Sequence, residues 1–443
     1  MNIEIAVSRP TSFVARALPR VAAVTAATVV LVLVSGLLLR PLGAALACAS
    51  WPMCAFVGSP GAWVDLAHRA VVVLVGVLLA AVAAASWVVR APAPARVYSL
   101  LALVFAASDV LIGAVLVRAA LPPADVTMHG LLGVLTLASS VAAALALRST
   151  DSGRVMQEMI GAYVALTKPR VISLLLFTTL AGMFVTPRGA PPWYLVLWTL
   201  LGGYMMAGAA NAVNMWYDSD IDDKMGRTKL RPIPSGRVTP RRALVFGLTM
   251  FALSLLIFVL FVNIAAAALA VIGFVYYTVI YTHWLKRSTW QNIVIGGGAG
   301  AIPPMIGWAA GSGSITWAAM LLFLIVFYWT PPHFWALALM KKRDYAAAGV
   351  PMLPVVAGDV ETSRQIVIYS VGMFAISLAL VPLGVMGWIY LIGATALGGL
   401  FIYYAWRAQR DPVPKRIWGL YGYSLLYLAL LFVVMMIDRL VLI

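Results

Sequence analysis

Residues 243–262 read ALVFGLTMFALSLLIFVLFV, a run of twenty residues without a single charge. A helix of that length rises about 30 Å, which is the thickness of the hydrocarbon core of a bilayer. The next run, residues 264–282, is equally free of charged residues. Because both runs are continuously apolar rather than alternating, they predict membrane-spanning helices and exclude a transmembrane barrel.

The same pattern recurs along the chain. Of 443 residues, 63% are hydrophobic and 10% are charged, whereas a soluble domain has roughly 25% charged residues. A window of about 19 residues predicts thirteen spans, at roughly 21–39, 68–89, 97–117, 126–147, 171–186, 193–214, 243–262, 264–282, 291–310, 316–339, 366–386, 388–406 and 418–437. The predicted fold class is an all-α polytopic membrane protein with about 13 spans.

A polar stretch from Arg148 to Arg170 separates the first four spans from the other nine. We therefore predict a four-helix transmembrane bundle over residues 1–148, a linker over 149–162 and a nine-helix domain over 163–443. The loops of the two groups differ in chemistry, since the acidic residues discussed below fall in the second.

The net charge of +16 follows an orientation pattern. If the N-terminus is cytoplasmic, 26 of the 31 Lys and Arg residues lie on the inner side and only five on the outer, namely Arg40, Arg69, Arg118, Arg188 and Arg439. Cytoplasmic loops collect Lys and Arg, so the pattern predicts a multi-pass protein of the cell membrane with its C-terminus outside. The charge therefore requires no nucleic-acid partner.

Acidic residues are scarce, yet Asp218, Asp220, Asp222 and Asp223 fall within six positions of one inner loop. Asn214, Asp218 and Asp222 are spaced by four, so a helical continuation of the preceding span places them on one face. Crowded carboxylates repel one another unless a cation joins them, and oxygen ligands of this kind suit Mg²⁺. The spacing predicts that these three residues bind magnesium.

A row of bases follows the acids directly: Lys224, Arg227, Lys229 and Arg231. A metal bridges phosphate oxygens, and Arg pairs with them bidentately. Carboxylates followed by cations therefore indicate a diphosphate substrate. The alternative, a solvated loop whose bases only orient the chain, is the better interpretation for Lys224 and for the later bases Arg237, Arg241 and Arg242.

These residues resemble a known family. Asn214-x3-Asp218-x3-Asp222 followed by Arg227-Thr-Lys-Leu-Arg231-Pro-Ile-Pro-Ser-Gly is similar to the first aspartate-rich motif of the UbiA-type intramembrane prenyltransferases, in the extended form of the protoheme IX farnesyltransferases. Further matching motifs are Leu166-Thr-Lys-Pro-Arg170, Tyr281-Thr-His-Trp-Leu-Lys-Arg287, the glycine-rich segment 292–304, the segment from His333 to Tyr345 and Val350-Pro-Met-Leu-Pro354. The resemblance runs from about Tyr163 to the C-terminus.

The resemblance implies a UbiA-type nine-helix bundle that transfers a farnesyl group from farnesyl diphosphate to a vinyl group of heme B, giving heme O, with Mg²⁺ as cofactor. It implies catalytic roles for Asn214, Asp218, Asp222, Arg227, Arg231 and His333. Substrate-binding roles are implied for Lys168, Arg170, Lys229, Tyr281, Lys286, Arg287, Lys341, Lys342 and Asp344.

The choice of acceptor depends on the loop after His333. Relatives that prenylate aromatic or quinone-precursor acceptors carry a second aspartate-rich motif, whereas this loop has a single acid, Asp344, beside Lys341, Lys342 and Arg343. Such a basic surface suits the propionates of heme. The alternatives are a prenyltransferase for an aromatic or quinone-precursor acceptor and a non-catalytic heme carrier. The carrier leaves the residues around Asp218 without a role.

The first four spans have their own motif on the outer side. Cys48 and Cys54, the only cysteines, share one loop, where an oxidising compartment makes a disulfide a candidate. His68 and His129 open neighbouring spans at one depth, which suits a bis-imidazole heme site. Residues 20–148 resemble one half of the heme A synthase family, which implies a module that binds or delivers heme b and a partnership with heme A synthase.

Overall fold

The computed structural model describes residues 13–39, 47, 59–118, 123–148, 150–223, 225–226 and 228–441. Every regular element in these ranges is a helix, and no strand occurs among them. The chain divides into two compact units, Met1–Glu158 and Met159–Ile443. The predicted all-α fold class is confirmed.

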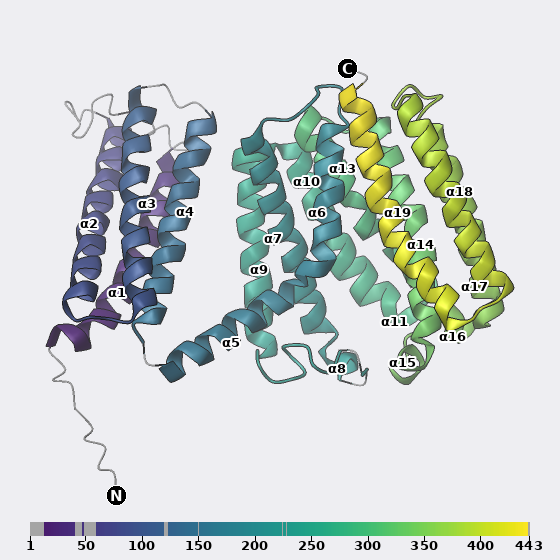
Figure 1. Cartoon of the computed structure of the whole chain (residues 1–443), viewed down its shortest axis with the longest axis horizontal. Coiled ribbons are helices and arrows are strands. Elements are labelled where there is room, and N and C mark those ends of the chain that lie inside the picture. The colour runs from purple at the N-terminus through teal and green to yellow at the C-terminus, as the bar shows by residue number, and fades with distance from the viewer. Residues whose placement is uncertain are drawn as a thin grey trace, which may run out of the picture. The chain divides into compact units, whose positions relative to one another are not determined.

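Four long helices make up the N-terminal unit (Figure 1), and they are α1 (Phe13–Leu39), α2 (Pro60–Val88), α3 (Ala93–Arg118) and α4 (Pro123–Ala146). Helix α2 starts where the Ser59 side chain accepts a hydrogen bond from the Ala62 amide, a standard N-cap. At the centre of the bundle Ala22, Ala95 and Ala102 are at most 1% exposed. Small side chains there let the backbones approach closely.

Residues 150–162 of the predicted linker are helical. Helix α5 (Thr150–Thr167) continues past it, and α6 (Pro169–Phe184) starts two residues later with a bend of 47°. Lys168, between them, has φ +56° and ψ +59°. The residue before a proline disfavours the right-handed helical region, and the left-handed region is strained for a residue with a Cβ. The break therefore fixes the direction of the Lys168 side chain.

The C-terminal unit is a larger bundle of broken and continuous helices (Figure 1). Its first half, after α6, contains α7 (Trp193–Tyr217), α8 (Ser219–Asp222), α9 (Pro240–Ile257), η1 (Phe258–Val262), α10 (Ile264–Val275), η2 (Tyr276–Leu285), α11 (Lys286–Ser288) and α12 (Asn292–Gly296). The second half contains α13 (Gly298–Ser312), α14 (Trp317–Met340), α15 (Lys342–Ala347), α16 (Leu353–Val356), α17 (Gly358–Ala379), α18 (Trp388–Arg410) and α19 (Pro414–Val441).

Helices α6 and α13 touch backbone to backbone. A Cβ added to Gly307 would lie 1.9 Å from the carbonyl oxygen of Thr179, and one added to Gly182 would lie 2.3 Å from that of Pro304. Gly307 and Gly311 form a small-x3-small pattern, which lets membrane helices pack at short range. No residue larger than glycine fits at these positions without moving a helix.

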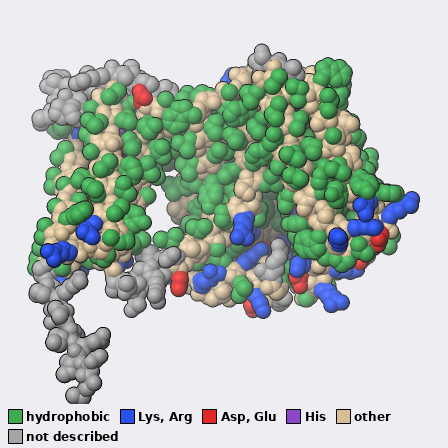
Figure 2. Space-filling model, viewed as in Figure 1, with side chains coloured by type: hydrophobic (Ala, Val, Ile, Leu, Met, Phe, Trp, Pro, Cys, Tyr) green, Lys and Arg blue, Asp and Glu red, His purple; other side chains and the backbone are tan. Residues whose placement is uncertain are grey.

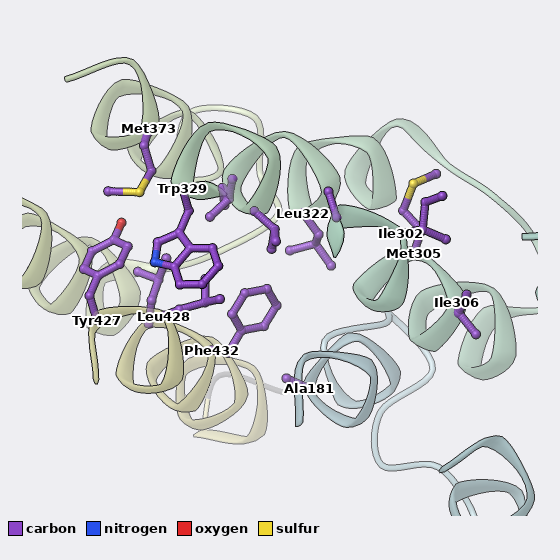
Figure 3. Close-up of a cluster of buried hydrophobic side chains, with 14 of the residues drawn as sticks. Ala181, Ile302, Met305, Ile306, Leu322, Trp329, Met373, Tyr427, Leu428 and Phe432 are labelled. Carbon is purple, nitrogen blue, oxygen red and sulfur yellow. The ribbon is translucent and has the colours of Figure 1, made fainter. Parts of the chain in front are cut away.

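The core of this unit lies between α13, α14 and α19 (Figure 3). Ile302 and Met305 of α13 lie toward one end of it, and Trp329 of α14 lies toward the other end with Leu428 and Phe432 of α19. In the span Asn292–Ser312, 72% of the apolar window is buried, against 22% for Pro240–Val262. Helix α13 is therefore an inner helix, whereas α9 faces the lipid along most of its surface.

The described residues contain 11 helices long and apolar enough to span a membrane, or 12 with the bent pair α5–α6. The predicted count of about 13 is therefore not confirmed. The predicted span 366–386 is the difference, because α17 ends at Ala379 and begins with Asp359, Glu361 and Arg364 in its first two turns. Its apolar part is shorter than the hydropathy pattern suggested.

A buried acidic residue, Asp438, lies near the C-terminal end of α19 and joins it to the start of α18. Asp438 is 2% exposed and accepts hydrogen bonds from the backbone amides of Gly387 at 2.6 Å and Tyr390 at 2.9 Å. These amides start α18, whose N-cap residue has no capping side chain of its own. The Asp438 carboxylate thus caps α18 from another helix, where an anion is favoured by the helix dipole.

Basic side chains gather at one end of the C-terminal unit (Figure 2), the end where α8, α15 and α16 lie. Its sides are covered by apolar side chains. Such a distribution is that of a helical bundle crossing a bilayer, with one charged end.

Candidate active site at the end of α7

Asn214, Asp218 and Asp222 lie together, as their spacing predicts. Helix α7 ends at Tyr217, but the amide of Asp218 still donates to the carbonyl of Asn214, and that of Asp222 to the carbonyl of Asp218, each at 2.9 Å. The helical repeat therefore continues through the break into α8. The three residues are 3%, 0% and 1% exposed, so two carboxylates are buried at one end of the bundle.

Both hydrogen bonds of Asp218 are made by one carboxylate oxygen, and the other oxygen has only a longer ion-pair contact. Its Oδ2 accepts from Asn214 Nδ2 at 2.7 Å and from Lys286 Nζ at 2.5 Å. Its Oδ1 is buried without a hydrogen bond, 3.6 Å from an amino group of Arg287. A buried carboxylate oxygen without a donor is costly, and it leaves one coordination position of Asp218 unused.

Asp222 is held by Arg231, whose Nη1 donates to both carboxylate oxygens, at 2.8 and 2.6 Å. The same loop is tightened by Thr228, which is 2% exposed and donates its hydroxyl to the Asp222 carbonyl at 2.7 Å. The two contacts explain why a loop without regular structure presents Arg231 toward α8. Arg227, another predicted site residue, is not among the residues that the structure describes.

Lys168 brings a third cation to the cluster. Its strained backbone points Nζ at Asn214 Oδ1, 2.9 Å away. Both amide hydrogens of Asn214 are used, because Nδ2 donates to Thr282 Oγ1 at 3.1 Å as well as to Asp218, whereas Oδ1 accepts one hydrogen bond and keeps a second lone pair. Lys286, Arg231 and Arg287 pair with the two buried carboxylates, and Lys168 adds a further basic group through Asn214. This excess of basic groups suits the binding of an anion.

An exposed contact lies at the rim of the cluster. Arg287 donates to both oxygens of Asp220 at 2.8 Å and lies 4.9 Å from the centre of the Tyr217 ring. The hydrogen bond from Arg287 holds the pKa of the Asp220 carboxyl below its ordinary value. Exposed pairs of this kind contribute little stability, so its effect is to orient Arg287.

A π-helix supplies the wall opposite α7. Segment η2 carries Tyr276, Tyr277 and Tyr281, and the Thr282 hydroxyl donates to the carbonyl of Tyr277, five residues earlier. The adjacent glycine run leaves room for two of these rings: a Cβ at Gly296 would lie 2.3 Å from Tyr281, and one at 298 would lie 2.9 Å from Tyr276. π-Segments are rare and concentrate at functional sites.

Sequence reasoning missed several polar partners of this wall. Asn211 donates to the Thr167 carbonyl at 2.9 Å and faces the Tyr277 hydroxyl at 3.5 Å, while Thr282 accepts from Asn214. Asn211 shares a helix face with Asn214, which was a signal, since two Asn residues in a membrane span are unusual. Thr282 lies in the motif Tyr281-Thr-His-Trp-Leu-Lys-Arg287, which was the only signal for it, and the motif did not indicate that its hydroxyl meets Asn214.

The remaining predicted residues are not all in this cluster. Arg170 and Lys229 are exposed, Tyr281 is half-buried and stacked 5.5 Å from Tyr277, and Lys342 pairs with Asp359 at 2.8 Å. Lys341 and Asp344 are half-buried at the start of α15, and no ion pair joins either of them to another described residue.

His333 lies deeper in the bundle, 7% exposed on α14. Its ring is stacked between Trp329 and Tyr421, with centroid distances of 4.5 and 4.8 Å. Its Nδ1 lies 2.7 Å from the hydroxyl of Ser424 on α19. The ring is thus fixed on both faces and at one nitrogen.

In the N-terminal unit, His68 is 8% exposed and its Nδ1 lies 2.8 Å from the hydroxyl of Ser35. That hydroxyl donates to the Val32 carbonyl at 2.9 Å, so the His68 nitrogen is the donor. The ring lies beside Gly36, where a Cβ would come within 3.3 Å of Cε1. The lone pair of His68 is therefore on Nε2.

In His129, as in His68, Nδ1 is the nitrogen that makes a hydrogen bond. Its Nδ1 lies 3.1 Å from the carbonyl oxygen and 2.6 Å from the carboxylate of Asp109, and its ring lies beside Gly113. Both partners are acceptors, so Nδ1 carries the hydrogen. Cys48 and Cys54, the predicted disulfide pair, lie outside the described residues.

The donor set fits a magnesium ion that is shared with a substrate. Among the described residues no group of three or more His, Cys, Asp or Glu side chains comes together. Mg²⁺ instead prefers one or two carboxylates together with substrate phosphates and water. Asp218, with its unbonded Oδ1, together with Asp222 and the Asn214 amide, suits that role.

Fold and site together define a class: a helical membrane protein with two buried carboxylates among cations at its charged end. The chain belongs to the UbiA prenyltransferase family, whose sequence profile matches residues 175–434. It is 47% identical over 437 residues to a protoheme IX farnesyltransferase of Roseiflexus castenholzii, a match covering 92% of this chain and 82% of that protein. A match of that length includes residues of both units.

Two other similarities bear on the C-terminal unit. A protoheme IX farnesyltransferase of Symbiobacterium thermophilum is 50% identical over 290 residues, covering 65% of this chain and 96% of that protein. The structure of a digeranylgeranylglyceryl phosphate synthase aligns with a TM-score of 0.55 at 18% identity, covering 64% of this chain and 99% of that one. The second similarity concerns the fold alone.

Proposed function

We propose that this protein transfers a farnesyl group from farnesyl diphosphate to a vinyl group of heme B, giving heme O. The observation that carries the proposal is the buried Asp218–Asp222 pair surrounded by Lys168, Lys286 and Arg231. It is supported by relatives named protoheme IX farnesyltransferase, one of them matched over 92% of this chain.

The reaction needs stabilisation of a leaving diphosphate. Mg²⁺, held by Asn214, Asp218 and Asp222, supplies neutralisation of phosphate charge. Lys286 and Arg231, which pair with the two carboxylates in this structure, are positioned to donate to diphosphate oxygens as the C1–O bond of the substrate breaks. Such preorganised charge in a water-poor site lowers the barrier to ionisation.

The allylic cation then alkylates the acceptor. The vinyl group supplies an electron pair to C1 of the farnesyl cation, a carbon–carbon bond forms, and water adds to the resulting cation with loss of one proton. The stacked rings of Tyr277 and Tyr281 present π-faces that favour a cation. We assign the heme propionates to Lys341 and Lys342, and the diphosphate to Arg227 together with Arg231. Arg170, Lys229 and Arg287 are further candidate substrate-binding residues.

We further propose that the N-terminal unit binds a b-type heme between His68 and His129. Nδ1 of both rings makes a hydrogen bond, which leaves Nε2 for iron ligation, and both rings lie beside a glycine. The unit then serves as a store or a delivery site for heme, with heme A synthase as a partner. We also propose a disulfide between Cys48 and Cys54, which rests on the sequence alone.

The orientation follows from the charge pattern. The basic end that carries Asp218 faces the cytoplasm, as does the N-terminus, and the C-terminus lies outside in the cell membrane. A protease added to sealed right-side-out vesicles should remove a C-terminal tag and leave an N-terminal tag intact. The reverse pattern would contradict the assignment.

One assay tests the activity. Membranes carrying the protein receive heme B, farnesyl diphosphate and Mg²⁺, and the pigments are separated by mass. Heme O is expected from the intact protein and not from Asp218→Ala or Arg231→Ala. Farnesylation of an aromatic or quinone-precursor acceptor without heme O would establish the alternative acceptor, and the absence of any product would contradict the proposal.

A further inference from the structure

The environment of His333 determines where its hydrogen lies. The Ser424 hydroxyl donates its one hydrogen to the Tyr421 carbonyl, three residues back on the same helix, at 2.6 Å. It has no second hydrogen to offer the imidazole, 2.7 Å away. Both contacts of Ser424 Oγ are hydrogen bonds at the same time only when His333 Nδ1 is the donor, and we assign this tautomer, which has its lone pair on Nε2.

Ser424 also holds the ring that stacks on His333. Its backbone carbonyl accepts a hydrogen bond from Trp329 Nε1 at 2.8 Å. Trp329 and His333 are four residues apart on α14, and their planes lie within 14° of each other. Tyr421 covers the other face at an angle of 21°. One residue of α19 thus orients two aromatic side chains of α14, and the imidazole cannot rotate.

The arrangement leaves Nε2 as the nitrogen of His333 that is available to a ligand. Among the described residues no hydrogen bond is made by His333 Nε2, although its Nδ1 is bonded. A ring fixed at Nδ1 by hydrogen bonding, uncharged and in an apolar span, is the form in which histidine binds metals. It cannot act as a hydrogen-bond donor through Nε2.

We propose that Nε2 of His333 is an axial ligand of the iron of the porphyrin acceptor, and that Ser424 is the positioning residue that fixes this tautomer. The proposal rests on the proposed function, since it assigns the iron to the heme substrate of the same bundle. It adds a basis for selectivity: the site prefers an iron porphyrin to the same porphyrin without metal.

The test compares two ligands on the full-length chain. His68→Ala and His129→Ala are introduced first, so that heme bound in the N-terminal unit does not contribute. Ferric heme B and metal-free protoporphyrin IX are then titrated without farnesyl diphosphate, and the two dissociation constants and the Soret spectrum are measured. Metal-free porphyrin serves as the folding control, because its affinity contains no iron–nitrogen bond.

The expected result is a preference for the iron porphyrin that His333→Ala removes without changing the affinity for the metal-free ring. Ser424→Ala should weaken heme binding by about 10-fold, the lower end of the range for residues that orient a metal-bound histidine. Ser424→Thr, which keeps the hydroxyl, should retain the original affinity. Added imidazole should restore the Soret spectrum of His333→Ala.

Equal weakening of both porphyrins by His333→Ala would overturn the proposal, because the ring would then be a packing element. Equal affinity of the parent protein for the two porphyrins would overturn it too. The product assay is independent of these titrations: failure to form heme O contradicts the proposed function, whereas loss of metal selectivity contradicts only the ligand assignment.

Discussion

Two buried carboxylates lie at opposite ends of the chain's larger unit, and their partners differ. Both carboxylate oxygens of Asp438 accept hydrogen bonds from backbone amides, which are held in place by the helix that they start. Asp218 has one oxygen bonded to side chains that can move, Lys286 and Asn214, and another with no hydrogen bond. A carboxylate satisfied by the backbone stabilises the fold, whereas one satisfied by side chains remains able to exchange partners for a ligand.

The largest effect is expected at Asp218, whose side-chain partners can be exchanged for a ligand. Asp218→Asn keeps the shape of the side chain and removes its charge, so heme O formation should fall by about 10²- to 10³-fold, the usual cost of losing one stabilising group in an active site. The thermal unfolding temperature in detergent should change little. Unfolding of this variant at the temperature where the parent protein is stable would contradict the distinction between the two acids.

The second prediction concerns Asp438, whose partners are backbone amides. Asp438→Ala leaves the amides of Gly387 and Tyr390 without an acceptor, which should lower the free energy of unfolding by about 2–3 kcal/mol. Asp438→Asn, which keeps one acceptor oxygen, is the matched control and should lose less. Activity per folded molecule should be unchanged in both, as measured by heme O formation after detergent denaturation curves fix the folded fraction.

A smaller effect is expected at the wall of the site. Thr282→Val removes the acceptor for Asn214 Nδ2 at constant shape, so Asn214 can turn away from Asp218. One neutral hydrogen bond is worth about 1 kcal/mol, which predicts about a 5-fold loss of heme O formation. Thr282→Ser keeps the hydroxyl and should behave as the parent protein. An equal loss in both variants would assign the effect to packing.

The smallest effect on activity is expected for Asp220, at the exposed rim of the cluster. Asp220→Asn breaks an exposed pair with Arg287, so activity near neutral pH should change by less than about 3-fold. The pKa of Asp220 is lowered in the folded protein, so its contribution is present above the ordinary carboxyl pKa and is lost as the pH falls through the lower value. The profile between pH 6 and 8 should therefore be the same in parent and variant.

Much of this architecture could be predicted from sequence because its physical origin is local. A run of twenty apolar residues defines a span by length alone, and the four-residue spacing of Asn214, Asp218 and Asp222 gives a common face whether or not the helix is interrupted. The error in the span count also has a local cause: the charged first turns of α17 shorten its apolar part.

The partners of these residues could not be predicted, because they come from distant parts of the chain. Thr282 meets Asn214 across 68 positions, and Ser424 meets His333 across 91. No periodicity encodes such pairs. Lys168 is an intermediate case. Pro169 gave a reason for a helix break, but the partner that the Lys168 side chain reaches, Asn214, lies 46 positions away in the sequence.

The burial of α13 has a consequence for biogenesis. Its span is rich in glycine and carries two internal prolines, Pro303 and Pro304, so its intrinsic helix propensity is low. Hydrophobic insertion alone places a helix in the bilayer, but the close contact of Gly307 with α6 forms only when the two helices pack in the membrane. During synthesis α13 emerges before α14 and α19, which enclose it. The bundle is therefore completed only after its last helix has been inserted.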